Sequence, residues 1–175
     1  MMRLPILATL FAFAACSTEP PSPPPASVVA TTEAAAPAPA SDDDCNLQTP
    51  LEPGIPGSPG NLIVSPRNPN GDSELSALMR VFVDDMNEVR AAMLAHQPVR
   101  DLWPTHRKMR CAWHSKPAER NAEFDARAQA YLATIRAFDS EPGQATYNAI
   151  VDSCVACHSQ SCGGPIDFID GLRWQ

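Results

Sequence analysis

The sequence predicts an all-α fold, an antiparallel up-down-up-down four-helix bundle over residues 72–160. Two observations predict it. Apolar residues recur at steps of three and four through this region, and no segment alternates apolar and polar residues as a half-buried strand would. Short connections join four such segments, which favours antiparallel neighbours. About a hundred residues remain once the flanking regions are set aside, which is enough for one small domain.

The first predicted helix begins at Asp72 or Ser73 and ends near His96, where Gln97-Pro98 closes it. Aspartate and serine are both good N-caps, and a proline cannot continue a helix. The apolar residues of this segment lie on one stripe: Leu75, Leu78, Met79, Phe82, Met86, Val89 and Met93.

The second predicted helix begins near Asp101, as its cap, and ends near His114. Pro104 falls in the first turn, where a proline is tolerated. Helical spacing relates the apolar and aromatic residues of the segment: Val99, Leu102, Trp103, His106, Met109 and Trp113.

The third predicted helix follows Ser115-Lys116-Pro117 and stops before Glu141-Pro142-Gly143. Its apolar face comprises Phe124, Ala128, Tyr131, Leu132, Ile135 and Phe138. The fourth helix keeps the same period through Tyr147, Ile150, Val151, Cys154 and His158.

The residues before the bundle read as an export signal and a tether. Residues 1–15 combine a positive charge with a short apolar run, as in a signal peptide, and the sequence up to Cys16 resembles the lipobox of bacterial lipoproteins. Lipidation is therefore expected at Cys16, and the Ser17 that follows it favours the outer membrane by resemblance. Residues 16–71 are rich in proline and alanine and are expected to form a disordered linker. Residues 161–175 form an apolar tail, which we expect to pack on the bundle.

The fourth helix carries the motif Cys154-Val155-Ala156-Cys157-His158. Two thiols at this spacing can each form a thioether with one vinyl group of the same porphyrin, and the adjacent imidazole can bind its iron. Three other interpretations are a redox-active cysteine pair, a structural disulfide, and a zinc site made of the two cysteines, His158 and Cys162.

The motif and its position resemble those of the cytochrome c′ group, the class II c-type cytochromes. The resemblance is carried by residues 147–158, by Ser76 to Arg80 and by Asp85-Met86, and it extends over about residues 72–160. It implies one covalent haem c, held near the C-terminus of the fourth helix by Cys154, Cys157 and His158.

The resemblance leaves the sixth iron ligand open. In low-spin relatives a methionine of the first helix binds the iron, and Met79 matches that position. In high-spin relatives the site is vacant and binds NO or CO. Other candidates are methionines of the same stripe, which are equally typical of a core, and histidines typical of surfaces and loops: Met86, Met93, His96, His106 and His114.

Three further cysteines are Cys45, Cys111 and Cys162. An exported protein can form disulfides. In the predicted topology the second and fourth helices end at the same end of the bundle, so we expect Cys111 to pair with Cys162. Cys45 could take either partner, and one thiol of the three stays without an intramolecular partner.

These features predict a lipid-anchored cytochrome on the periplasmic side of a bacterial membrane. It is expected to carry single electrons between redox partner proteins, and the alternative is a gas-binding haem protein with an open sixth site. No acid–base dyad, nucleophile elbow or phosphate loop stands out, so no enzyme activity is expected. The net charge of −7 argues against a nucleic-acid partner. The family often dimerises through its first two helices, so a homodimer is one expected state.

Overall fold

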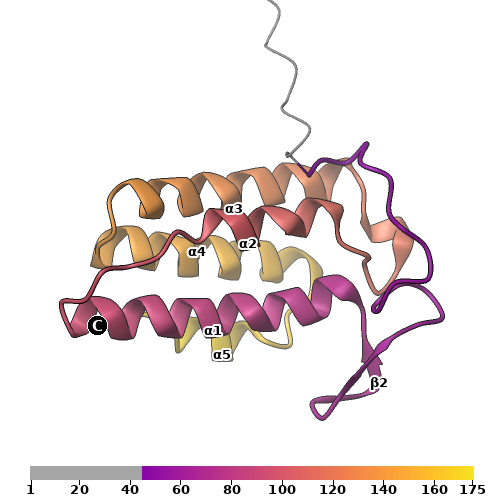
Figure 1. Cartoon of the computed structure of the whole chain (residues 1–175), viewed down its shortest axis with the longest axis horizontal. Coiled ribbons are helices and arrows are strands. Elements are labelled where there is room, and N and C mark those ends of the chain that lie inside the picture. Colours follow the sequence, from indigo (N-terminus) through magenta and orange to yellow (C-terminus); the bar gives the residue numbers. More distant parts are fainter. Residues whose placement is uncertain (1–44) are drawn as a thin grey trace, which may run out of the picture. The chain divides into compact units, whose positions relative to one another are not determined.

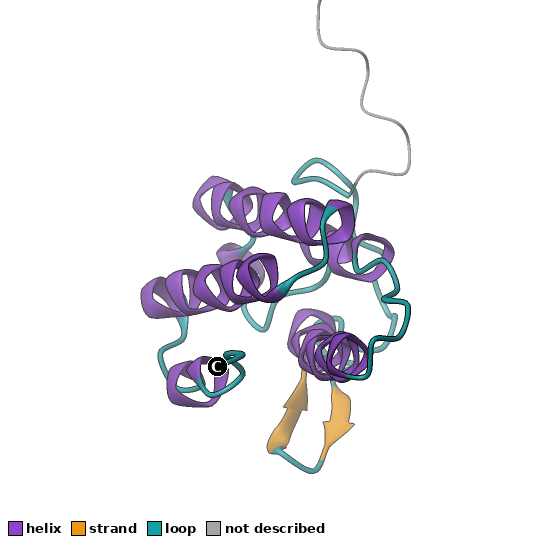
Figure 2. Cartoon of the chain, turned by 90° about the vertical axis from the view of Figure 1, so that its left-hand side faces the viewer, coloured by secondary structure: helices purple, strands orange, loops and turns teal. Residues whose placement is uncertain are grey.

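The described part of the protein is mostly helical and carries one small two-stranded sheet (Figures 1 and 2). The structure is a computed structural model that describes residues 45–175, so the expected signal peptide, Cys16 and the linker up to residue 44 lie outside the described residues. In chain order the elements are β1 (Ile63–Ser65), β2 (Asn68–Asp72), α1 (Glu74–Leu94), α2 (Trp103–His106), the 3-10 helices η1 (Arg107–Cys111) and η2 (Pro117–Glu119), α3 (Ala122–Ser140), α4 (Gln144–Ser161) and α5 (Ile166–Asp170).

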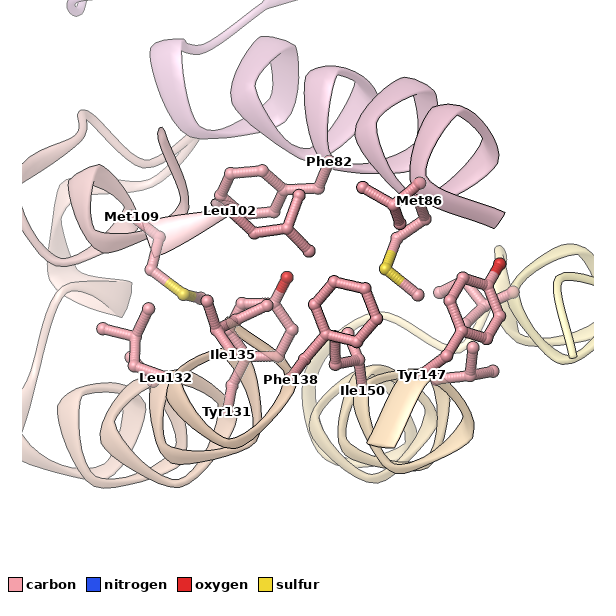
Figure 3. Close-up of a cluster of buried hydrophobic side chains, with 14 of the residues drawn as sticks. Phe82, Met86, Leu102, Met109, Tyr131, Leu132, Ile135, Phe138, Tyr147 and Ile150 are labelled. Carbon is pink, nitrogen blue, oxygen red and sulfur yellow. The ribbon is translucent and has the colours of Figure 1, made fainter. Parts of the chain in front are cut away.

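The first predicted helix is confirmed as α1. The hydroxyl of Ser73 accepts a hydrogen bond from the Ser76 amide at 3.2 Å and caps the helix, as its position predicts. The helix ends at Leu94, and His96 has a left-handed backbone with φ of 54°. The apolar stripe of α1 points toward the core, where its buried members include Phe82 and Met86 (Figure 3).

The prediction of one helix from Asp101 to His114 is wrong. α2 lasts only four residues, η1 follows it, and the backbone becomes extended at Ala112. The cap also differs from the expected Asp101, because the carboxylate of Asp139 on α3 accepts hydrogen bonds from the Leu102 and Trp103 amides at 2.8 and 2.9 Å. A tertiary contact thus supplies the acceptor that the local sequence was expected to supply.

The third and fourth predicted helices are confirmed as α3 and α4. α3 begins five residues later than its expected proline start, because Pro117 opens the short η2 and Asn121 accepts from the Phe124 amide at 3.0 Å as the cap. The chain runs in opposite directions along α3 and α4, which lie side by side (Figure 1). Their facing side chains join those of α1 in one apolar core that includes Tyr131, Phe138 and Ile150 (Figure 3).

Residues 45–72 are folded, which corrects both the expectation of a linker up to Gly71 and that of a fold without strands. β1 and β2 form an antiparallel hairpin just before α1 (Figure 2). The segment before the hairpin packs on the start of α1, where the Glu74 amide donates to the Gly57 carbonyl at 3.1 Å. Gly57 has φ of +90°, and a side chain there would collide with the Glu74 backbone.

The C-terminal tail packs on α4 and α1. Ile169 of α5 is buried, and the Tyr147 hydroxyl of α4 donates to the Leu172 carbonyl at 3.1 Å. The guanidinium of Arg90 on α1 donates to the same carbonyl at 3.0 Å, and the Trp174 amide donates to the Asn148 side chain at 2.9 Å. No helix among residues 45–175 is both long enough and apolar enough to cross a membrane.

The structure joins Cys45 to Cys111 by a disulfide, so the expected pairing of Cys111 with Cys162 is wrong. The segment after Cys45 lies against the end of η1, where Arg120 donates to the carbonyls of Asn46 and Thr49 at 2.7 and 2.8 Å. These bonds hold Cys45 beside Cys111, whereas Cys162 is exposed at the end of α4 and has a free thiol.

We predict that Cys45→Ser lowers the free energy of unfolding by about 2–4 kcal/mol, because it opens a long loop in the unfolded chain. The disulfide closes a sequence separation of 66 residues. Urea denaturation measures the loss, and Cys162→Ser is the matched control with little expected effect. Peptide mapping without reductant should find Cys45 linked to Cys111, and a peptide linking Cys111 to Cys162 would contradict the structure.

Candidate functional site

The motif Cys154, Cys157 and His158 lies in the last two turns of α4. All three residues are half-buried. Positions separated by three and four residues share one face of a helix, so the two sulfurs and the imidazole are presented on the same side. This side of α4 borders two cavities.

The smaller cavity, about 350 Å³, is lined mainly by hydrophobic and aromatic side chains. The larger cavity, about 530 Å³, has more polar and charged residues around it. Both fall in the range of about 300–1,000 Å³ that is typical of ligand and cofactor sites. Both cavities are bordered by Cys157, His158 and Met79, and Cys154 lines only the smaller one. Further apolar and aromatic residues of the smaller cavity are Phe82, Val83, Met86, Met109, Tyr131, Phe168, Ile169 and Leu172, and Arg67 and Arg80 also border it.

The imidazole of His158 is oriented by the end of its own helix. Its Nδ1 lies 3.1 Å from the carbonyl oxygen of Cys162. A carbonyl can only accept, so Nδ1 carries the proton and donates. The other nitrogen, Nε2, then has a free lone pair, which is the form of histidine that binds a metal.

The two thiols of the motif are free and are not joined to each other. Burial raises the pKa of Cys154 to about 12, and the charge of Cys157 adds to this effect. Burial also raises the pKa of Cys157, although the nearby Arg127 opposes it. A thiolate is the nucleophile in thiol–disulfide exchange, so protonated thiols disfavour a redox-active pair at neutral pH. The structural disulfide considered between Cys154 and Cys157 is likewise not formed.

Met79 is the stripe methionine best placed toward the motif. It projects from α1 and borders both cavities together with His158. Met86 borders only the smaller cavity, while Met93 and His96 line neither, and His96 is exposed. The structure therefore brings together four of the predicted cofactor residues, which are Cys154, Cys157, His158 and Met79.

His106 is buried, whereas the sequence analysis expected a surface or loop histidine. Its ring stacks on Phe82 with centroids 4.0 Å apart, and its Nδ1 lies 2.6 Å from the Tyr131 hydroxyl. Its Nε2 lies 3.2 Å from a carboxylate oxygen of Asp85, whose other oxygen contacts Arg100. Both ring nitrogens are engaged, so His106 is a poor candidate for an iron ligand.

The same bonds determine the protonation of His106. The Asp85 carboxylate accepts, so Nε2 carries the proton, and Nδ1 accepts from the Tyr131 hydroxyl. Burial lowers the pKa of His106 to about 3, and the positive charge of Arg100 adds to this effect. Tyr131 lines the smaller cavity, so this neutral network forms part of the wall beside Cys154.

His114 is also buried, and it lines the larger cavity. It lies in the loop after Cys111, where the Leu75 amide donates to the Trp113 carbonyl at 2.9 Å. This bond holds the loop on the first turn of α1. The Nε2 of His114 has no hydrogen-bond partner among the described residues.

The zinc site considered for the motif is not assembled. Within residues 45–175, no three His, Cys, Asp or Glu side chains come together in a group that could hold a metal ion. The backbone carbonyl of Cys162, and not its sulfur, contacts His158.

Comparison of the chain with protein-family models, with curated proteins and with solved structures finds no match.

Asp85 and Arg127 were not predicted to belong to a site, and His114 was considered only as an alternative iron ligand. Asp85 lies in the apolar stripe of α1 between Phe82 and Met86, and that position signals a buried carboxylate with a partner. Arg127 lies three residues after Phe124, at the edge of the apolar stripe of α3. This position is a weaker indication of a functional residue. The burial of His114 had no signal in the sequence, because it depends on the loop after η1.

We predict that acidification destabilises the protein between about pH 6.5 and pH 3. The pKa of His106 is about 3 in the folded chain and 6.5 without its surroundings, so below pH 6.5 the unfolded chain binds a proton that the folded chain does not. Stability is full above pH 6.5 and falls by up to about 1.4 kcal/mol per pH unit as the pH decreases toward 3. Burial also lowers the pKa of His114, which acts in the same direction.

Urea denaturation at several pH values measures this dependence. His106→Gln should weaken the slope, and His96→Gln, which changes an exposed histidine, is the control and should keep it. An unchanged slope in His106→Gln would show that His106 is not a buried neutral imidazole.

Proposed function

We propose that the protein is a monohaem c-type cytochrome that carries single electrons between redox partner proteins. The observation that carries this proposal is the meeting of four side chains at one pair of cavities. Cys154, Cys157 and His158 border the smaller cavity from α4, and Met79 borders it from α1; all of these except Cys154 also border the larger cavity.

The residues present suit a covalent haem. Cys154 and Cys157 would hold the macrocycle through thioethers, and His158, whose Nδ1 bonds the Cys162 carbonyl, would bind the iron through Nε2. Met79 is the proposed sixth ligand. The haem would supply a one-electron couple, and a thioether ligand raises its reduction potential. The hydrophobic lining of the smaller cavity would exclude water from the site.

The proposed fold is the antiparallel four-helix bundle of the class II c-type cytochromes. α1, α3 and α4 would be three of its helices, and α2 with η1 would stand in for the second. The support is that Leu102, which directly precedes α2, and Met109 of η1 are buried in the same core as the long helices.

The proposed location is the periplasmic side of a bacterial membrane, with a lipid anchor at Cys16 and the outer membrane favoured. The apolar N-terminal run and the Cys45–Cys111 disulfide support export, because disulfides persist in oxidising compartments. Redox partners would then be other exported or membrane-bound proteins. By the same resemblance, the protein would form a homodimer.

The alternative function is a gas-binding protein with an open sixth site. Its support is that Met79 borders both cavities, which leaves room for a small ligand beside it. The two functions differ in whether Met79 binds the iron.

Haem attachment is tested on full chain matured in a strain with a c-type maturation system. We expect one haem in a pyridine haemochrome assay and its added mass on the peptide that contains the motif. Changing both Cys154 and Cys157 to alanine should abolish the added mass, and Cys162→Ser is the matched control that should keep it. Colourless protein with an unmodified peptide would reject the proposal.

The proposed binding of Met79 to the iron is tested by the absorption spectrum of the haem. In the matured protein we expect a six-coordinate, low-spin spectrum that does not respond to CO. Met79→Ala should convert it to a high-spin spectrum that responds to CO, because a methyl group cannot bind iron. Met93→Ala removes a methionine of the same stripe that lines neither cavity, and it should leave the spectrum unchanged. A CO-responsive, five-coordinate spectrum in the unmodified protein would instead support the gas-binding alternative.

A further inference from the structure

The larger cavity is bordered by two residues with unpartnered buried donors. Among the described residues, the buried side-chain nitrogen and oxygen atoms that lack a hydrogen-bond partner are His114 Nε2 and Arg127 Nε. Both residues line this cavity. His114 is only 5% exposed, so bulk water does not satisfy its ring.

The two donors lie on the same side of α3. The ring of His114 packs edge-on against Phe124, with ring centroids 4.2 Å apart. Arg127 is three residues further along α3, and residues at that spacing are neighbours on one helix face. His114 is held from the other side by its loop, because the Trp113 amide donates to the Glu74 carboxylate at 2.9 Å.

Leaving such groups unpartnered is unfavourable. A buried donor without an acceptor costs about 1–3 kcal/mol, and charged donors cost more. Because both residues border the same cavity, an acceptor bound there would remove this cost. Burial, followed by the charge of Arg120, lowers the pKa of His114, although Glu119 opposes the shift. A neutral imidazole still carries one N–H and can donate from Nε2.

The charges nearby favour a singly charged acceptor with two oxygens. Arg127 already pairs with Glu123 through Nη1 at 2.6 Å, and Lys116 pairs with Glu119 at 3.2 Å. These carboxylates repel any anion, and they disfavour a doubly charged phosphate more strongly than a singly charged carboxylate. A planar guanidinium has the geometry to bind a carboxylate.

We propose that the larger cavity is a carboxylate-binding subsite in which Arg127 Nε and His114 Nε2 donate to one carboxylate. Two sources share this chemistry: a propionate group of the covalent haem, and a free small carboxylate. Only the first source rests on the proposed function, because a free carboxylate would bind whether or not the chain carries haem.

The test uses full chain with and without haem, and sodium acetate as the probe. The Arg127 Nε–H resonance is followed by NMR, with sodium chloride at equal ionic strength as the reference. In the haem-free chain we expect a saturable shift with acetate and none with chloride. His114→Phe should weaken acetate binding about tenfold or more, as expected for one hydrogen bond to a charged group.

Arg127→Lys keeps the charge but removes Nε, and it should weaken acetate binding similarly when the His114 ring resonances are followed. Arg136→Lys is the matched control, because Arg136 lies on α3 over the Trp103 ring and lines neither cavity. It should bind acetate as the unmodified chain does.

The haem-loaded chain identifies the source. If a propionate occupies the subsite, acetate should no longer shift the Arg127 resonance, and His114→Phe should move that resonance without any acetate. A saturable acetate shift in the loaded chain would assign the subsite to a free carboxylate. If acetate causes no saturable shift in either form and His114→Phe leaves the Arg127 resonance of the loaded chain unchanged, the subsite does not exist. A chain that never takes up haem would reject the proposed function and leave the acetate measurement valid.

Discussion

The imidazole of His106 connects α1, α2 and α3 in the centre of the domain. It stacks on Phe82 of α1, donates to Asp85 of the same helix and accepts from Tyr131 of α3. A rigid, fully hydrogen-bonded ring in this place sets the spacing between the helices more strictly than aliphatic packing would. Two cavities lie beside α1 and the C-terminal half of α4, and the motif borders them.

The two cavities differ in a way that suits an amphipathic cofactor. The smaller one is walled mainly by hydrophobic side chains, with Tyr131 of the His106 network among them, and Arg67 and Arg80 also border it. The larger one offers buried donors, Arg127 and His114. The proposed haem, with an apolar macrocycle and carboxylate side chains, would contact both sets of residues.

The segment before α1 contributes more to this arrangement than a tether would. The disulfide from Cys45 holds the end of η1, and bonds from the Trp113 backbone hold the following loop on α1. These constraints bury His114 beside the larger cavity. The C-terminal tail also contributes, because α5 and Leu172 border the smaller cavity. The Leu172 carbonyl accepts hydrogen bonds from Arg90 and Tyr147.

The sequence by itself determined the periodic helices and the position of the motif, because apolar spacing and local caps are short-range properties. α1, α3 and α4 follow from such signals, and the Ser73 cap is one of them. Only the tertiary structure decided the features that depend on distant partners. Asp139 caps α2 across a helix interface, Cys45 pairs with Cys111 because Arg120 holds the segment after Cys45 near η1, and the hairpin forms in a proline-rich region. Burial of His106 and His114 likewise depends on rings and loops far away in the chain, which no local pattern encodes.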